Sequence, residues 1–140
     1  MIESKNVKTV LEILQDEIRG DVAAALSKMD PGYTMTWVYK SPKGALFPVS
    51  KPDFKAEMKE VYKIEGRKYD IKNVAEGEHV VMVELIESYP DPETKKLHHT
   101  PLVLVIVVRD GKVMRLRDYC YTQISCLDLD KKDIEGIYKK

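Results

Sequence analysis

The sequence predicts an α+β domain in which helical segments come first and an antiparallel sheet follows. Apolar residues recur at helical spacing through the first 30 residues, and from Arg67 onward they alternate with a period of two. Asp110-Gly111 stands between two strand-like runs in the stretch 97–125, which is a strong hairpin signal. With 140 residues the chain is long enough to bury one hydrophobic core.

Two helices are expected before the first strand. The first ends at Gly20, and Asp21 is placed to cap a second, shorter helix that closes in the turn 30–32. The apolar side of the first helix is expected to be Val7, Val10, Leu11, Leu14 and Ile18. Its polar side is expected to be Glu12, Gln15, Asp16 and Glu17.

The first strand is expected over residues 33–39. Its bulky side chains share one parity and therefore one face, which is either core or the wall of an apolar pocket. After the loop 40–50, Ser50 and Asp53 form a capping box for a third helix, which carries Phe54 and Met58 on its apolar side.

Four strands then follow as an antiparallel meander, and a short helix is expected in the tail 126–140. The strand 102–108 is apolar on both faces, whereas a strand with one solvent-facing side would alternate. Both faces are therefore expected to be covered. A second copy of the chain is the expected cover of the outer face, which predicts a homodimer.

Composition excludes several classes of function. Lys plus Arg equals Asp plus Glu at 23 each, so the basic excess that a nucleic-acid binder needs is missing. The longest apolar run, 102–108, is too short for a membrane span, and the N-terminus does not read as a signal peptide. Two cysteines without paired spacing are typical of a cytoplasmic protein, and the histidines lack the spacing of a metal site.

The order of elements, the hairpin DGKV followed by RDY at 117–119, and the run TPLVLV at 100–105 resemble the nuclear transport factor 2-like superfamily. The nearest branch is SnoaL-like, with polyketide cyclases and limonene epoxide hydrolase. The resemblance covers about 5–125 and implies a single domain over 1–140 with a helical tail at 126–140. It also implies a cone-shaped, curved antiparallel sheet wrapped round the N-terminal helices, a cystatin-like roll, with a deep apolar pocket.

Asp118 is the first catalytic candidate. Strand alternation places it beside Met114, Leu116 and Cys120, and a carboxylate among apolar neighbours is costly to ionise. Its pKa is therefore expected to rise toward a value useful for proton transfer. The alternatives are a structural ion pair with Lys or Arg, or a hydrated position at the rim.

Three further residues are candidates through position or resemblance. Glu87 and Asp118 match the two acids of limonene epoxide hydrolase, but Leu85 stands where its arginine would be, which argues against epoxide hydrolysis. Tyr121 occupies the place of an acid in SnoaL-like cyclases and could donate a hydrogen bond. His98 begins the fourth strand of the sheet and could reach the pocket mouth.

The sequence therefore predicts a cofactor-free pocket protein with acid–base chemistry on a small apolar or aromatic substrate. Asp118 is the expected proton acceptor, assisted by Glu87, His98 or Tyr121. The alternative is a non-catalytic module that binds a small ligand or dimerises. The predicted pocket wall is Tyr33, Met35, Trp37, Tyr39, Tyr69, Leu85, Met114 and Leu116.

Overall fold

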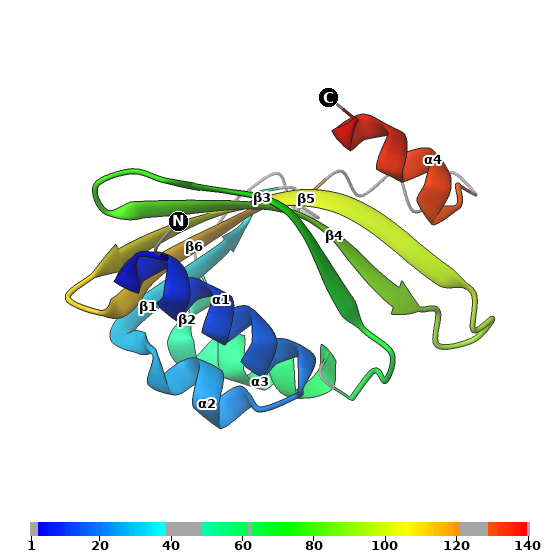
Figure 1. The fold of residues 1–140 in the computed structure, drawn as a ribbon. Helices are drawn as coiled ribbons and strands as arrows, with labels where there is room; N and C mark the ends of the chain where they lie inside the picture. The colour runs from blue at the N-terminus through cyan, green and yellow to red at the C-terminus, as the bar shows by residue number, and fades with distance from the viewer. Residues whose placement is uncertain (1–2, 39–48, 62, 121–128, 140) are drawn as a thin grey trace.

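The computed structural model describes residues 3–38, 49–61, 63–120 and 129–139. The elements in chain order are α1 (Lys5–Ile18), α2 (Val22–Ser27), β1 (Met29–Trp37), β2 (Val49–Ser50), α3 (Lys51–Val61), β3 (Lys68–Glu76), β4 (Val80–Pro90), β5 (Leu97–Arg109), β6 (Lys112–Cys120), α4 (Lys131–Glu135) and a 3-10 helix (Gly136–Tyr138). Helices α1 to α3 lie under one curved sheet, and α4 lies on its opposite face (Figure 1).

The sheet has six strands in the order β2-β1-β6-β5-β4-β3. Strands β3 to β6 form the predicted antiparallel meander, and β5 turns into β6 at Asp110 and Gly111, both with positive φ. The remaining long strand, β1, pairs with β6 in parallel. The predicted α+β class, with a curved sheet over N-terminal helices and a short C-terminal helix, is confirmed.

The expected turn at 30–32 lies within β1 as an irregularity. Met29 pairs with Val113, yet Thr34 pairs with Arg115, so the β1 side of the ladder holds extra residues. The Gly32 amide donates to the Asp30 carboxylate across 2.7 Å, which closes the local bend. Beyond it, Met35 and Trp37 alternate regularly against β6.

Helix α1 buries part of the predicted apolar face and also two residues that were assigned to its polar side. Ser4 caps the helix by accepting a hydrogen bond from the Val7 amide, and a row on one side enters the core. That buried row is Val10, Ile13, Leu14 and Glu17, with Asp16 beside it. The prediction that Asp16 and Glu17 lie on the solvent side is wrong.

The core lies between the inner face of the sheet and the helices. Val81, Val83 and Leu85 of β4 are fully buried on this face, as their alternation predicts. Helix α3 contributes Phe54 and Met58 from below. Toward one end of the sheet the packing opens into a cavity.

The outer face is partly covered by the chain itself. Ile86, which points to this side of β4, is fully buried, and Ile134 of α4 is almost so. Two ion pairs hold α4 against β3, from Lys131 to Asp70 at 2.9 Å and from Lys72 to Glu135 at 2.7 Å. The C-terminal helix thus takes part of the surface that the sequence assigned to a second copy.

The rest of the outer face stays open in the single chain. Met82 is 47% exposed and Tyr119 is 45% exposed.

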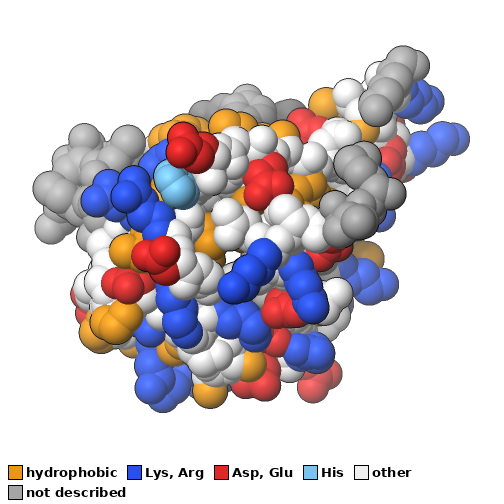
Figure 2. Space-filling view, turned by 60° about the vertical axis from the view of Figure 1, so that its left-hand side comes forward, with side chains coloured by type: hydrophobic (Ala, Val, Ile, Leu, Met, Phe, Trp, Pro, Cys, Tyr) orange, Lys and Arg blue, Asp and Glu red, His pale blue; other side chains and the backbone are white. Residues whose placement is uncertain are grey.

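On the face shown in Figure 2, Lys and Arg side chains are interspersed with Asp and Glu. Within the described ranges, no helix is both long enough and apolar enough to cross a bilayer.

Candidate functional site

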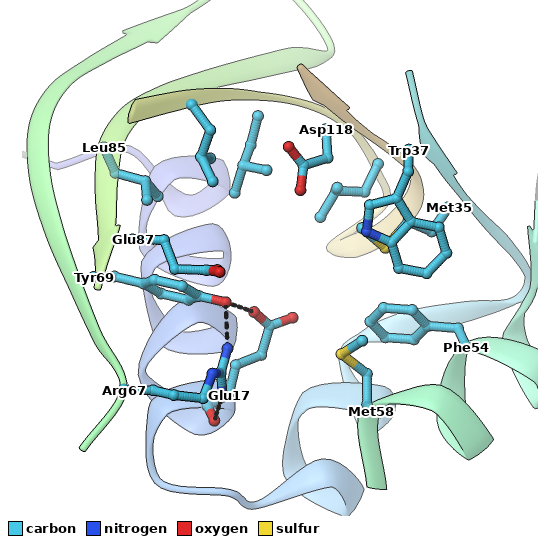
Figure 3. A pocket seen from close by; sticks show the side chains of 13 residues that line it. Glu17, Met35, Trp37, Phe54, Met58, Arg67, Tyr69, Leu85, Glu87 and Asp118 are labelled. Atoms are coloured by element: carbon cyan, nitrogen blue, oxygen red, sulfur yellow. Dashed lines mark hydrogen bonds between the residues drawn. The ribbon is translucent and has the colours of Figure 1, made fainter. Parts of the chain in front are cut away.

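A cavity of about 380 Å³ opens between the inner face of the sheet and helices α1 and α3. Its size falls in the usual range for small-molecule sites. The cavity has two chemically different sides, which Figure 3 shows. Its apolar lining is Met35, Trp37, Phe54, Met58, Leu85, Leu102, Leu104 and Leu116. Its polar lining is Glu17, Arg67, Tyr69, Glu87 and Asp118.

The ring-bearing side of the cavity comes from β1 and α3. Trp37 sits next to Asp118 because the two residues are partners in the parallel β1–β6 ladder. Phe54 and Met58 are one helical turn apart on α3, so both project from the same side of the helix. Aromatic rings and a thioether here favour a ligand with a flat or apolar body.

Asp118 points from β6 into the cavity (Figure 3). The residue is 8% exposed, and its Oδ1 has no hydrogen-bond partner among the described residues. Burial raises the pKa of Asp118 to about 7, with a further contribution from the charges of Glu87 and Glu17. A carboxyl group with this pKa can both accept and return a proton near neutral pH.

Glu87 is the second carboxyl group of the cavity and comes from β4. Burial raises its pKa, while the positive charge of Arg67 and the hydroxyl of Tyr69 oppose the rise. The positive charge of Arg67 matters because Leu85 of β4 occupies the position at which limonene epoxide hydrolase has an arginine. In this cavity the arginine is Arg67, which directly precedes β3.

A hydrogen-bonded group joins the start of β3 to α1. Arg67 Nη2 donates to the Tyr69 hydroxyl at 2.9 Å, and that hydroxyl donates to Glu17 Oε2 at 3.1 Å. Arg67 Nη1 also approaches the main-chain oxygen of Glu17 at 3.4 Å. Since Tyr69 and Glu87 are paired across β3 and β4, the group lies directly beside the second carboxyl group.

The structure brings together seven of the residues predicted for the site. They are Asp118, Glu87, Met35, Trp37, Tyr69, Leu85 and Leu116, all of which line the cavity. Tyr39 and Tyr121 lie outside the described residues. Tyr33, Met114 and His98 are described and do not belong to the lining.

Tyr33 is a core residue rather than pocket wall. It is 1% exposed and packs edge-on against Phe54, with ring centroids 5.3 Å apart. Phe54 therefore presents itself to the cavity, with Tyr33 against it. The bulky side chains of β1 therefore serve two roles: Tyr33 belongs to the core, whereas Met35 and Trp37 form part of the cavity wall.

Met114 is displaced by a bulge at the start of β6. Val108 pairs with Val113 and Val107 with Arg115, so Met114 is the extra residue on its strand. Val113 is fully buried in its stead. Strict alternation back from Asp118 assigned Met114 to the inner face, and the bulge makes that assignment wrong.

His98 lies too far along β5 to act with Asp118. It shares the inner parity of Leu104, the partner of Asp118 on β5, but it lies six positions along the strand from Leu104, which is about 20 Å. Its Nε2 lies 3.0 Å from the carboxylate of Asp91, and its ring packs on Tyr89. The histidine stabilises the end of the β4–β5 hairpin.

Two polar residues of the cavity were missed from the sequence, Glu17 and Arg67. Glu17 lies seven residues after Val10, in the helical row that also holds Ile13 and Leu14, so a signal existed. Arg67 directly precedes β3 and is only 7% exposed, although arginine is usually found at the surface. Its position on the inner parity of Tyr69 is the only hint that the sequence holds.

The arrangement does not suit a metal ion. Among the described residues, no three His, Cys, Asp or Glu side chains converge in a way that could hold one. The carboxyl groups of the cavity come from three separate elements, α1, β4 and β6, and face a shared space. What the cavity can do chemically is move a proton beside a hydrogen-bonding group.

Comparison with known proteins supports the fold. No protein-family model and no curated protein matches the sequence. Among solved structures, a provisionally assigned SnoaL-like polyketide cyclase from Jannaschia sp. is similar, with 15% identity, a TM-score of 0.72, and coverage of 87% of this chain and 92% of that one. The epoxide hydrolase/cyclase-like enzyme SalBIII is similar at 16% identity and a TM-score of 0.73, covering 85% of this chain and 92% of that one.

TerC, co-crystallised with polyporic acid, is similar at 20% identity and a TM-score of 0.71, covering 85% of this chain and 93% of that one. These identities are low, so the likeness is one of fold. The chain has the nuclear transport factor 2-like fold in the form that SnoaL-like polyketide cyclases share. The resemblance found in the sequence is confirmed at that level.

Proposed function

We propose that this protein binds a small apolar or aromatic molecule in the cavity and carries out acid–base chemistry on it, as a SnoaL-like cyclase or isomerase. The observation that carries the proposal is Asp118. Its carboxyl group is buried and faces the cavity, its Oδ1 has no partner among the described residues, and its pKa is about 7. A structural ion pair would have lowered that pKa instead.

Asp118 is the proton acceptor in this scheme. Glu87, across the cavity, has the second raised pKa and can hold the proton or return it at another atom of the substrate. The positive charge of Arg67 lies at the polar side, where it would stabilise an oxyanion as it forms. Because side chains carry every proton, the reaction needs no cofactor.

The class of reaction is supported by the structural neighbours. One is named as a polyketide cyclase, and SalBIII is described through pyran ring formation in the polyether salinomycin. Ring closure and isomerisation both proceed by moving protons on a carbon and oxygen framework. An aliphatic and aromatic cavity with two titratable carboxyl groups suits such a substrate.

The open part of the outer face supports a homodimer as the working form. Met82 of β4 and Tyr119 of β6 expose apolar surface on the outer face, on the two strands that flank β5. A second copy would cover them, and the cavity on the inner face would stay accessible. We place this dimer in the cytoplasm, consistent with the free thiol of Cys120.

The test begins with ligands found by thermal stabilisation in a library of small aromatics and lactones. Each ligand is then incubated with wild-type protein and with Asp118→Asn, and turnover is followed by NMR. The proposal predicts that the variant keeps binding and loses ~100-fold or more of the turnover.

Glu12→Gln serves as the matched control, since Glu12 is an exposed acid on α1 that pairs with Lys8. It is expected to leave turnover unchanged. Equal turnover by Asp118→Asn and wild type would contradict the assignment of the proton acceptor. Binding without turnover in either protein would favour the alternative, a non-catalytic ligand-binding module.

A further inference from the structure

The polar side of the cavity carries an excess of negative charge. Three of its described lining residues are acids, Glu17, Glu87 and Asp118, and one is a base, Arg67. The guanidinium is already engaged by the Tyr69 hydroxyl and approaches the main-chain oxygen of Glu17. Like charges held together away from water repel one another, so the cavity stabilises any positive charge that enters it.

Asp118 Oδ1 indicates where a positive charge could bind in the cavity. Asp118 is more than nine-tenths buried, and its Oδ1 has no hydrogen-bond partner among the described residues. Buried carboxylate oxygens in folded proteins are almost always paired, so an unpaired one calls for a partner from outside the chain. Since Asp118 faces the cavity, a molecule that enters the cavity can supply that partner.

The opposite side of the cavity adds a second attraction for a cation. Trp37 and Phe54 present aromatic side chains, and Met35 and Met58 present thioethers. The faces of aromatic rings attract ammonium groups, and the attraction strengthens where water is excluded. A metal ion is not the natural occupant, because no described group of acids converges to hold one.

We propose that the ligand is an organic cation, an ammonium group on an apolar or aromatic body, held between Asp118 and the ring of Trp37. The body of the ligand lies against the apolar lining between the side chains of Leu85 and Leu116. Its charged head faces the carboxyl groups of the cavity. The inference rests on the proposed function, since it takes the cavity as the ligand site and names the chemical class of what enters it.

Binding should depend on pH through the groups around Asp118. Glu87 of β4 and Glu17 of α1 face it and raise its pKa, while Arg67 lies beside Glu87 and Cys120 lies two residues along β6. A cation binds best once Asp118 is ionised. Its affinity is therefore expected to fall about tenfold per pH unit as the pH drops below 7.

The experiment compares two probes of the same shape. Benzylammonium is positively charged near pH 8 and carries N–H groups that can donate to Asp118 Oδ1, and ethylbenzene replaces its nitrogen with carbon. Trp37 is the single tryptophan of the chain and lines the cavity, so its fluorescence reports binding of either probe. Near pH 8 the cation is expected to bind the full-length protein at least ~10-fold more tightly than the neutral probe.

Asp118→Asn is expected to abolish that preference, and Glu12→Gln is expected to preserve it. Equal or tighter binding of the neutral probe by the wild type would overturn the cation inference and leave the proposed function in place. A cation preference that survives in Asp118→Asn would overturn the assignment to Asp118. If neither probe perturbs Trp37, both the cation inference and the cavity as ligand site fail.

Discussion

Two clusters of charge, one on each face of the same sheet, behave in opposite ways. On the outer face, Asp70 lies 2.9 Å from both Lys72 and Lys131, and its pKa is lowered to about 2, chiefly by these two hydrogen-bonded amines. On the inner face, Asp118 has no such partner, and burial raises its pKa to about 7. The same type of side chain thus has a lowered pKa where two amines pair with it and a raised pKa where it is buried without a partner.

The outer cluster is balanced and therefore structural. Asp70 and Glu135 are matched by Lys72 and Lys131, and together they hold α4 on the sheet. The inner cluster has three acids to one base, and Glu17, Arg67 and Asp118 are each buried. Buried groups of like charge lower the stability of the fold, and they are typical of sites where a bound ligand or proton offsets the repulsion. The balance of charge therefore distinguishes the candidate functional site on the inner face from the structural ion pairs on the outer face.

Removing the inner charge is expected to have the largest effect. The folded pKa of Asp118 is about 7 and its ordinary value is 3.8, so ionising it costs roughly 4 kcal/mol of stability above pH 7. This stability is present below pH 3.8 and is lost as the pH rises through 7. Asp118→Asn is therefore expected to be roughly 2–4 kcal/mol more stable than wild type near pH 8, with little difference near pH 4.

Urea denaturation at both pH values measures this change, with Glu12→Gln as the control that should follow wild type throughout. A variant less stable than wild type near pH 8 would show that the Asp118 carboxylate is satisfied in the folded state. The comparison between the two clusters would then collapse.

A smaller effect is expected from the hydrogen-bonded group in the cavity. Tyr69→Phe removes the hydroxyl that joins Arg67 to Glu17 and should cost about 1 kcal/mol of stability. It should also raise the pKa of Glu87 further, because the hydroxyl opposes the effect of burial there. Denaturation and an NMR titration of Glu87 report the two consequences.

Tyr119→Phe is the matched control, since Tyr119 lies on the outer side of β6, away from the cavity, and the variant keeps the ring that the proposed dimer would cover. It should change neither quantity. An unchanged Glu87 titration in Tyr69→Phe would mean that the hydroxyl serves Glu17 alone.

The smallest effect is expected at the outer cluster. Asp70 is about one-third exposed, so its ion pairs are screened and Asp70→Asn should cost only about 0.5 kcal/mol at neutral pH. Its lowered pKa means that the contribution is present above pH 3.8 and lost as the pH falls toward 2. Denaturation at low salt and at about 1 M salt should show the cost shrinking as salt rises. A cost of several kcal/mol would place this cluster in the same class as the inner one.

Much of this comparison could be predicted from the sequence, for physical reasons. Asp118 was found by alternation because β6 is regular from Arg115 onward, so parity with Leu116 holds. Met114 was misplaced because a bulge shifts parity and leaves no sequence mark here. His98 was assigned the right face, but parity says nothing of distance along a strand.

The charges that complete the site were harder to find. Glu17 was assigned to solvent because charged helical residues usually face water, although it shares a row with Ile13 and Leu14. Arg67 reaches the cavity beside Glu17 of α1, a contact between segments 50 residues apart that no local pattern encodes. Local rules thus located the acid, and tertiary packing supplied its neighbours.

The central claim is that Asp118 is a buried acid without a partner, held ready to exchange a proton in the cavity. The direct test is an NMR titration of its carboxyl carbon, assigned by the signal that disappears in Asp118→Asn. A pKa near 7 is the result the structure predicts. A pKa near 4 would mean that the carboxylate is hydrated or paired, and it would contradict both the acid–base role and the contrast with Asp70.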